Sequence, residues 1–200
     1  MVRTPIDFIF DFGSPNAYLV HRAIPILEAR HRVTFRYVPA LLGGMFKLTG
    51  NQSPASAFGH IRNKPEYEAM DRERYATRYG IDDFVMNPHF PVNTMHLMRG
   101  AIAAALLGEA GYIDAVFAAM WRDGLKMDEP DVVREVLLKA NLPAQAIQSV
   151  GAEPNTKSAL ITATETAVER GAFGSPTFFV DDRMWFGKER LAEVVEAAAH

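Results

Sequence analysis

The sequence contains no cysteine among its 200 residues. A chain without thiols forms no disulfide, offers no thiolate to a metal ion and carries out no thiol–disulfide exchange of its own. Any sulfur chemistry at this protein would therefore need a thiol supplied by another molecule.

Long apolar runs and an excess of basic charge are also absent. No stretch approaches the roughly 18 apolar residues that a membrane-spanning helix needs, and Asp7 and Asp11 interrupt the apolar N-terminal segment, so it does not resemble a signal peptide. The net charge is -3, and Lys and Arg are scattered, which argues against nucleic acid as a partner. The histidines show no zinc-ligand spacing, and we predict no metal site. We expect a cytoplasmic protein.

The residues that are present predict a strand–helix–strand unit at the start of the chain. Ile6, Phe8, Phe10 and Phe12 alternate along a strand and form an apolar face, with Asp7 and Asp11 on the opposite face. Helix-like spacing follows over 14–31, and alternation returns over 33–37. This order predicts a parallel pair of strands with a right-handed crossover.

The middle of the chain is expected to be helical and the end to return to the sheet. The glycine-rich stretch 41–54 lacks periodicity and is predicted to be a loop, as is 82–91. Helices are predicted over 65–79, 94–110, 112–123, 131–140, 143–150 and 155–170, followed by a hairpin of 177–180 with 184–186 and a last helix that begins at the Gly187 turn. We expect residues 61–151 to form an inserted helical subdomain in a main domain of residues 1–60 and 152–200.

Ser14 is the first candidate for a functional residue. It follows the first predicted strand, and Pro15 suits the first position of the next helix, so Ser14 has the place and side chain of an N-cap. The free N–H groups and positive dipole of such a helix start favour an anion. From these residues alone, an anion site and a plain cap both remain open.

Several stretches together resemble a known family along the whole chain. They are residues 11–19, 42–47, 50–51, 91–94, 173–179 and 186–191. They look like 2-hydroxychromene-2-carboxylate isomerase, which is close kin to kappa-class glutathione transferase; both are similar to DsbA-like proteins. The resemblance implies an α/β thioredoxin-like fold with a large all-helical insertion.

In redox members of this fold, a Cys-x-x-Cys motif stands where this chain has Ser14, Pro15, Asn16 and Ala17. Without cysteine, a thiol–disulfide oxidoreductase is excluded. The resemblance implies instead that glutathione is a cofactor with its sulfur at Ser14. The hydroxyl and the helix start would then lower the thiol pKa from its free value of about 8.5.

Further site residues follow from the resemblance. It implies that the Ser175–Pro176 bond is cis, so that the main chain there pairs with glutathione, although by itself Ser-Pro before a strand is a plain turn. Asn51 is also expected to bind glutathione. The turn Phe186-Gly187-Lys188-Glu189 would receive its γ-glutamyl end, with Glu189 where the family commonly has Asp. Lys47 and Asn93 are expected in the substrate pocket, although a loop lysine is usually a solvated charge and Asn93 suits a helix cap.

The leading hypothesis is a glutathione-dependent isomerase that interconverts 2-hydroxychromene-2-carboxylate and trans-o-hydroxybenzylidenepyruvate in aromatic degradation. A kappa-like glutathione transferase or peroxidase is the alternative within enzymes, and a non-catalytic thioredoxin-like binding module is the alternative outside them. The same motifs would serve all three functions. The family resemblance also implies a homodimer.

Overall fold

A mixed sheet of four strands is formed within residues 5–199, the part of the chain that the computed structural model describes. Its order is β2-β1-β3-β4, with β1 at Ile6–Phe10, β2 at Phe35–Pro39, β3 at Thr177–Val180 and β4 at Arg183–Phe186. β1 runs parallel to β2, and the β3–β4 hairpin is antiparallel to β1 and within itself. The predicted strand–helix–strand unit and the late hairpin are therefore confirmed.

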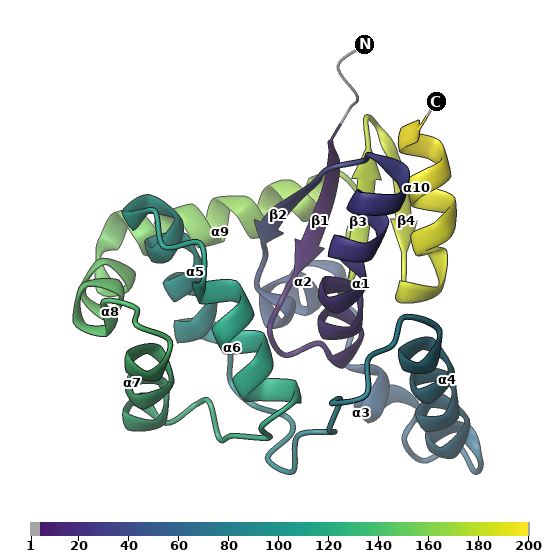
Figure 1. Ribbon diagram of the computed structural model, residues 1–200, viewed down its shortest axis with the longest axis horizontal. Helices are drawn as coiled ribbons and strands as arrows, with labels where there is room; N and C mark the ends of the chain where they lie inside the picture. Colours follow the sequence, from purple (N-terminus) through teal and green to yellow (C-terminus); the bar gives the residue numbers. More distant parts are fainter. Residues whose placement is uncertain (1–4, 200) are drawn as a thin grey trace.

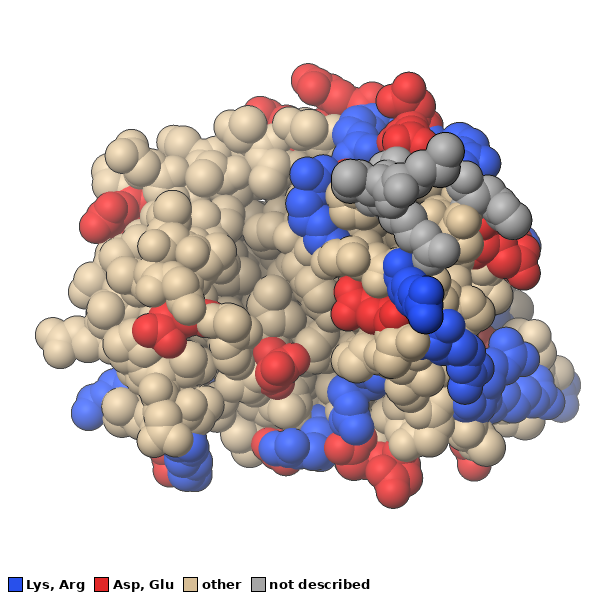
Figure 2. Space-filling model, turned by 45° about the horizontal axis from the view of Figure 1, so that its top comes forward, with Lys and Arg blue, Asp and Glu red and all other residues tan. Residues whose placement is uncertain are grey.

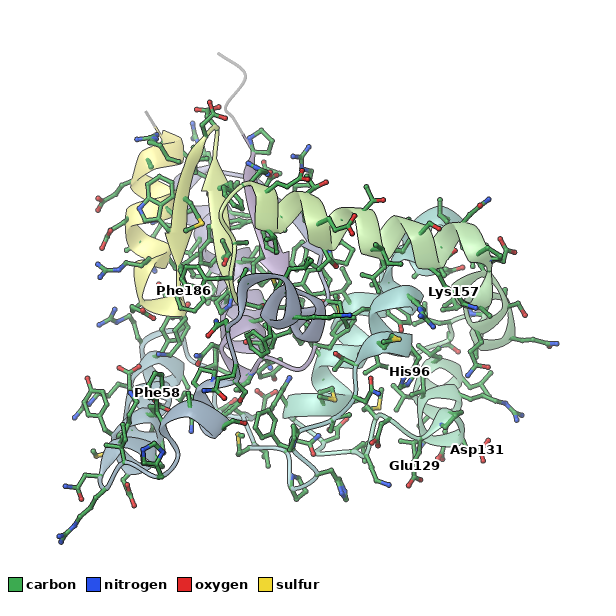
Figure 3. All side chains as sticks on the ribbon, turned by 180° about the vertical axis from the view of Figure 1, so that it is seen from behind. Phe58, His96, Glu129, Asp131, Lys157 and Phe186 are labelled. Carbon is green, nitrogen blue, oxygen red and sulfur yellow. The ribbon has the colours of Figure 1, made fainter. Side chains whose placement is uncertain are left out.

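Helices cover both faces of this sheet. α1 (Pro15–His31) and α10 (Leu191–Ala199) lie on one face, whereas α9 (Pro154–Glu169) and α2 (Leu42–Thr49) lie on the other (Figures 1 and 3). Phe8 and Phe10 belong to the large core that includes α1 and α10 residues, and Ile9 packs among α2 and α9 residues. All of β1 is buried, because its two faces meet two different layers.

The segment between β2 and α9 is mostly helical. It contains α3 (Pro54–Phe58), α4 (Lys64–Arg78), α5 (Met95–Leu107), α6 (Tyr112–Trp121), α7 (Pro130–Lys139) and α8 (Ala144–Ala152), and a short helix η1 (Lys188–Arg190) precedes α10. Figure 1 shows α5–α8 at one end of the molecule and α3 and α4 at the other. The predicted helices and the loop before α5 are confirmed within a few residues, and the division into two domains stays a prediction.

The prediction of a loop over 41–54 was wrong for most of this stretch, because residues 42–49 form α2 and α3 begins at Pro54; only residue 41 and the short connection 50–53 are not helical. The start of α2 is stabilised from far away in sequence: the Leu42 N–H donates to Asp11 Oδ2 at 2.7 Å. Gly44 has a packing reason, since a Cβ there would lie 3.1 Å from Thr164 Cγ2 of α9. A helix capped and packed by distant residues leaves little local signal.

Asp7 and Asp11 do not face solvent, although their alternation with apolar residues suggested an exposed polar face. Asp7 forms ion pairs of 2.7 Å with Arg36 and 2.8 Å with Arg170. Asp11 has no basic partner among the residues described and lies where β1 ends. This second face of β1 is covered by α2 and α9, so its polar residues need partners inside the protein.

Charge is unevenly spread on the surface. On the face in Figure 2, Lys and Arg gather over the half of the molecule that contains the sheet, and the half built from α5–α9 shows fewer charges. None of the helices within residues 5–199 combines the length and apolar character needed to cross a bilayer.

Candidate functional site

Ser14 joins the end of β1 to the start of α1 and is buried, with an exposed fraction of 5%. Its Oγ accepts the Ala17 N–H at 3.1 Å, which makes it the N-cap of α1. The same hydroxyl donates to the Ser175 carbonyl oxygen at 2.9 Å. Pro15 has no N–H, so the N–H of Asn16 is the first free donor of the helix. Ser14 is thus the helix cap that the sequence predicted, and its hydroxyl contacts Ser175, the residue before the predicted cis-proline.

The partner of the Ser14 hydroxyl, Ser175, belongs to the segment just before β3. The Ser175–Pro176 peptide bond is cis, as the resemblance implied. Ser175 Oγ accepts the Asp11 N–H at 3.2 Å, so the side chain as well as the main chain of Ser175 ties this turn to the end of β1. Within residues 5–199, no main-chain N–H donates to the Ser175 carbonyl and no main-chain carbonyl accepts the Ser175 N–H. The main chain of Ser175 can therefore pair with an extended ligand.

Ser14 and Ser175 line one pocket with a cavity volume of about 280 Å³. Its apolar wall consists of Leu42, Phe46, Phe58, Met86, Phe90 and Phe186. Figure 3 shows Phe186 at the end of β4 and Phe58 below it, at the same end of the molecule. A concave, mainly apolar pocket with several polar groups is typical of a small-molecule site.

The buried Asp11 joins three segments around the pocket through hydrogen bonds. Its side chain accepts hydrogen bonds from the Gly13 N–H, the Leu42 N–H and the Thr94 hydroxyl, each at 2.7 Å. Its main-chain oxygen accepts the Ser14 N–H at 3.1 Å. Complete burial raises the pKa of Asp11, and these donors oppose but do not cancel that rise. One carboxyl group thus fixes the Ser14 turn, the start of α2 and the segment before α5.

Two polar features of the pocket were missed by sequence reasoning. Asn16 Oδ1 is buried and has no hydrogen-bond partner among the described residues, although Asn16 lines the pocket. Glu68 and Arg72 of α4 also line it, with Pro65 on the same helix face at i, i+3 and i+7 spacing. The sequence shows this spacing, but nothing in the local sequence indicates which face of this polar helix lines the pocket.

Among the described residues that line this pocket, Arg72 is the only Lys or Arg. No carboxylate within residues 5–199 forms an ion pair with it. Its helix is anchored through neighbouring residues instead: Asp71 pairs with the buried Lys188, whose Nζ also lies 5.6 Å from the centre of the Tyr75 ring. The anchor leaves the Arg72 guanidinium available to an anion in the pocket.

The structure brings several of the predicted cofactor residues together. Asn51 lines the pocket, and its Nδ2 donates to the Phe173 carbonyl at 2.9 Å, two residues before Ser175. Phe186 lines it and contacts the Phe173 ring with centroids 4.5 Å apart. The Gly187 N–H donates to the Pro176 carbonyl at 3.0 Å.

Glu189 is placed one turn beyond Phe186 and is exposed. Gly187 has φ of +98°, and its missing side chain leaves the space that the Glu189 carboxylate fills. The Glu189 side chain therefore folds back over the turn.

Pro176, Gly187 and Glu189 belong to the two turns just described but do not line the pocket, and three other predicted residues lie elsewhere. Lys188 is buried against Asp71 and does not line the pocket. Asn93 is exposed and accepts the Met95 N–H at 3.1 Å, a capping contact at the start of α5. Lys47 lines a different cavity beside Leu48 and Lys157; Figure 3 shows Lys157 well away from Phe58 and Phe186. Within residues 5–199, no three His, Asp or Glu side chains gather as metal ligands would.

Comparison with known proteins matches this arrangement over the whole described chain. Residues 5–199 fit the DSBA-like thioredoxin domain. A 2-hydroxychromene-2-carboxylate isomerase from Pseudomonas putida is 30% identical over 189 residues, which cover 93% of this chain and 90% of the relative. The chain belongs to the 2-hydroxychromene-2-carboxylate isomerase and kappa-class glutathione transferase family.

Two further relatives support the same membership. A solved 2-hydroxychromene-2-carboxylate isomerase structure superposes with a TM-score of 0.81 at 29% identity, covering 96% of this chain and 93% of the other. The rat glutathione S-transferase kappa 1 is 23% identical over 201 residues, covering 93% of this chain and 87% of the transferase. The thioredoxin-like fold with a helical insertion is thereby confirmed, and members of this family are enzymes.

Proposed function

We propose that this protein is a glutathione-dependent isomerase that interconverts 2-hydroxychromene-2-carboxylate and trans-o-hydroxybenzylidenepyruvate. Bound glutathione would supply a thiolate that adds reversibly to the unsaturated chain of the substrate and so permits rotation about a bond that is otherwise locked. The observation that carries the proposal is the contact of Ser14 with the Ser175 main chain at the wall of an aromatic pocket.

The polar groups of the pocket fit a thiol-bearing peptide. Asn16 Oδ1 is a buried acceptor without a partner in the described part of the chain, and the Ser175 main chain offers a donor and an acceptor to an extended backbone. A peptide carries amide N–H and C=O groups that would satisfy both. The Glu189 carboxylate, folded over the Gly187 turn, would meet the ammonium of a γ-glutamyl group.

Ser14 would stabilise charge rather than attack the substrate. Its hydroxyl is hydrogen-bonded to the Ala17 N–H and to the Ser175 carbonyl, and neither group can serve as a base. The first free N–H of α1 and the helix dipole would add to the stabilisation of a thiolate there.

The substrate would occupy the aromatic side of the pocket. Phe46, Phe58 and Phe90 offer ring surfaces to an aromatic acid. Because Arg72 is the cation that lines this pocket and Lys47 lines another, we assign the substrate carboxylate to Arg72.

Turnover of 2-hydroxychromene-2-carboxylate, followed by absorbance with and without glutathione, tests the proposal. Ser14→Ala should lower kcat/KM by about 10- to 100-fold, since a hydrogen bond to a charged group contributes about 1.5–3 kcal/mol. Ser14→Gly is the matched variant, because Gly keeps most of the capping stability but also lacks the hydroxyl. Full turnover without glutathione, or unchanged turnover in both variants, would refute the mechanism.

The second candidate is a kappa-like glutathione transferase or peroxidase, which the similarity to the rat kappa enzyme favours. An isomerase returns glutathione unchanged, whereas a transferase or peroxidase consumes it. Measuring free thiol before and after many turnovers separates the two functions. The homodimer and the cytoplasmic location remain predictions.

A further inference from the structure

The single proton of the Ser14 hydroxyl is already used in a hydrogen bond in this structure. A carbonyl oxygen can only accept, so the 2.9 Å contact with Ser175 is a bond that Ser14 donates. The Ala17 N–H occupies a lone pair of the same Oγ at 3.1 Å. The hydroxyl proton therefore points at the Ser175 carbonyl, and it must turn away from it before Ser14 can donate to a sulfur anion.

The Ser175 carbonyl is also a main-chain group with which an extended peptide could pair. Ser175 is partly exposed at the pocket wall, and no main-chain N–H within residues 5–199 donates to its carbonyl. A peptide that pairs with a free main-chain segment places its own N–H on such a carbonyl. Two donors, the Ser14 hydroxyl and a ligand N–H, thus meet at one oxygen.

We infer that the amide N–H of the bound thiol compound releases the Ser14 hydroxyl from the Ser175 carbonyl and so switches on stabilisation of the thiolate. This inference rests on the proposed function and goes beyond it, because it makes a group of the ligand part of the activating device. The Ser14 hydroxyl keeps its proton throughout, and the thiol proton leaves to solvent.

The release is electrostatic rather than steric. A carbonyl oxygen has two lone pairs, so both donors have room on it. The ligand N–H, however, draws electron density from that oxygen and makes it a poorer acceptor for the hydroxyl. An anionic sulfur is the stronger acceptor, since hydrogen bonds to charged groups are about twice as strong as neutral ones.

This inference predicts which class of thiol the site activates. The site activates N-acylated cysteines, including cysteinyl peptides, because their amide N–H sits on the carbon next to the one that bears the sulfur. Simple thiols such as 2-mercaptoethanol or 3-mercaptopropionate lack this N–H, so their thiolates compete for the Ser14 hydroxyl with a Ser175 carbonyl that keeps its full acceptor strength, and they are stabilised less.

The test compares glutathione with its depsipeptide analogue, in which an ester oxygen replaces the cysteinyl N–H and nothing else changes. The thiol pKa of each compound is measured by ultraviolet absorbance of the thiolate, with the protein in excess so that the compound is fully bound. In the wild-type protein we expect the pKa of bound glutathione to fall about one unit further than that of the ester, a tenfold difference in the thiol–thiolate equilibrium.

The same titration in Ser14→Ala isolates the hydroxyl. Here the thiol pKa of the two bound compounds should fall equally from their free values, because there is no hydroxyl to release. Ser14→Gly provides the same comparison with the helix cap largely retained, so that a folding defect in the alanine variant does not decide the result.

Two outcomes would overturn the inference alone. One is an ester whose pKa falls as far as that of glutathione in the wild-type protein, and the other is a difference that persists in both Ser14 variants. If calorimetry detects no binding of glutathione to the wild-type protein, the proposed function fails and the inference fails with it.

Discussion

The pocket has two walls that are built differently. One, the frame wall, is formed by Ser14 and Ser175 over Asp11, and hydrogen bonds join these residues although they come from distant parts of the chain. The other, the helical wall, presents Phe58, Glu68 and Arg72 from α3 and α4. The frame wall fixes positions, which suits charge stabilisation at one atom. The helical wall offers side chains with fewer constraints, which suits recognition of a substrate.

Removing the charge of Asp11 should have the largest effect, because it breaks the frame wall at its centre. In Asp11→Asn an NH₂ group would face either the Leu42 N–H or the Gly13 N–H and Thr94 hydroxyl, leaving buried donors unsatisfied. We expect a loss of about 3 kcal/mol in the free energy of unfolding, at about 1–3 kcal/mol for each unsatisfied group. Turnover should fall at least about tenfold as Ser14 loses its fixed geometry. Denaturant unfolding and saturated turnover measure the two effects.

Asp7→Asn is the matched control on the same strand face. It removes the ion pairs to Arg36 and Arg170 far from the pocket, so it should cost about 2 kcal/mol and leave turnover within about twofold. A large loss of turnover in Asp7→Asn, or none in Asp11→Asn, would show that Asp11 acts on stability alone.

The pH dependence of the free energy of unfolding should differ in sign between the Asp7 and Asp11 substitutions. Burial raises the pKa of Asp7, but hydrogen bonds and charge from Arg36 and Arg170 outweigh it and hold the pKa below 3.8. The stabilisation by Asp7 is therefore present above pH 3.8 and lost as the pH falls below it, so the penalty of Asp7→Asn should shrink in acid. The pKa of Asp11 is raised above 3.8, so the folded wild-type protein gains stability on acidification toward pH 3.8 and the penalty of Asp11→Asn should grow. Unfolding curves at several pH values check both signs.

Substitution of Arg72 tests the helical wall. Arg72→Leu should raise KM for the aromatic acid about tenfold, close to 1.4 kcal/mol, because it removes the one cation that lines the pocket within residues 5–199. Stability and kcat should change little, since the anchor of α4 is Asp71 with Lys188. Arg74→Leu, on an exposed position of the same helix and outside the pocket, is the control. Equal effects of the two substitutions would point to long-range charge instead of contact.

Part of the frame wall was predictable from the sequence: the places of Ser14 and Ser175 in the fold were expected, whereas the burial of Asp11 beneath them was not, because its alternation with apolar residues suggested an exposed face. Ser14 follows a strand and precedes Pro15, and Ser175 precedes a proline and a strand, so each falls at a definite point of the fold. Most helices and all four strands were predicted for the same reason, from periodicity and turn residues.

The helical wall was not predictable, since it depends on contacts between distant residues. The face of α4 that meets the pocket is fixed by Asp71 with Lys188, a pair 117 positions apart. Lys47 shows the same limit: consecutive residues of a helix point about 100° apart, so in α2 Phe46 enters the pocket and Lys47 enters another cavity. Without knowing that α2 is a helix, no such direction could be assigned.

Truncation of the Phe58 side chain should have the smallest effect on turnover, and it distinguishes the role of the helical wall from that of the frame wall most clearly. Phe58 is 46% exposed and lines the pocket, so Phe58→Ala should leave stability almost unchanged. We expect KM for the aromatic substrate to rise about fivefold, near 1 kcal/mol, and KM for glutathione to stay constant. Ile61→Ala, with a side chain of similar exposure outside the pocket, controls for lost apolar surface. A rise in KM for glutathione alone would mean that the helical wall binds the cofactor, and the division between the two walls would have to be reversed.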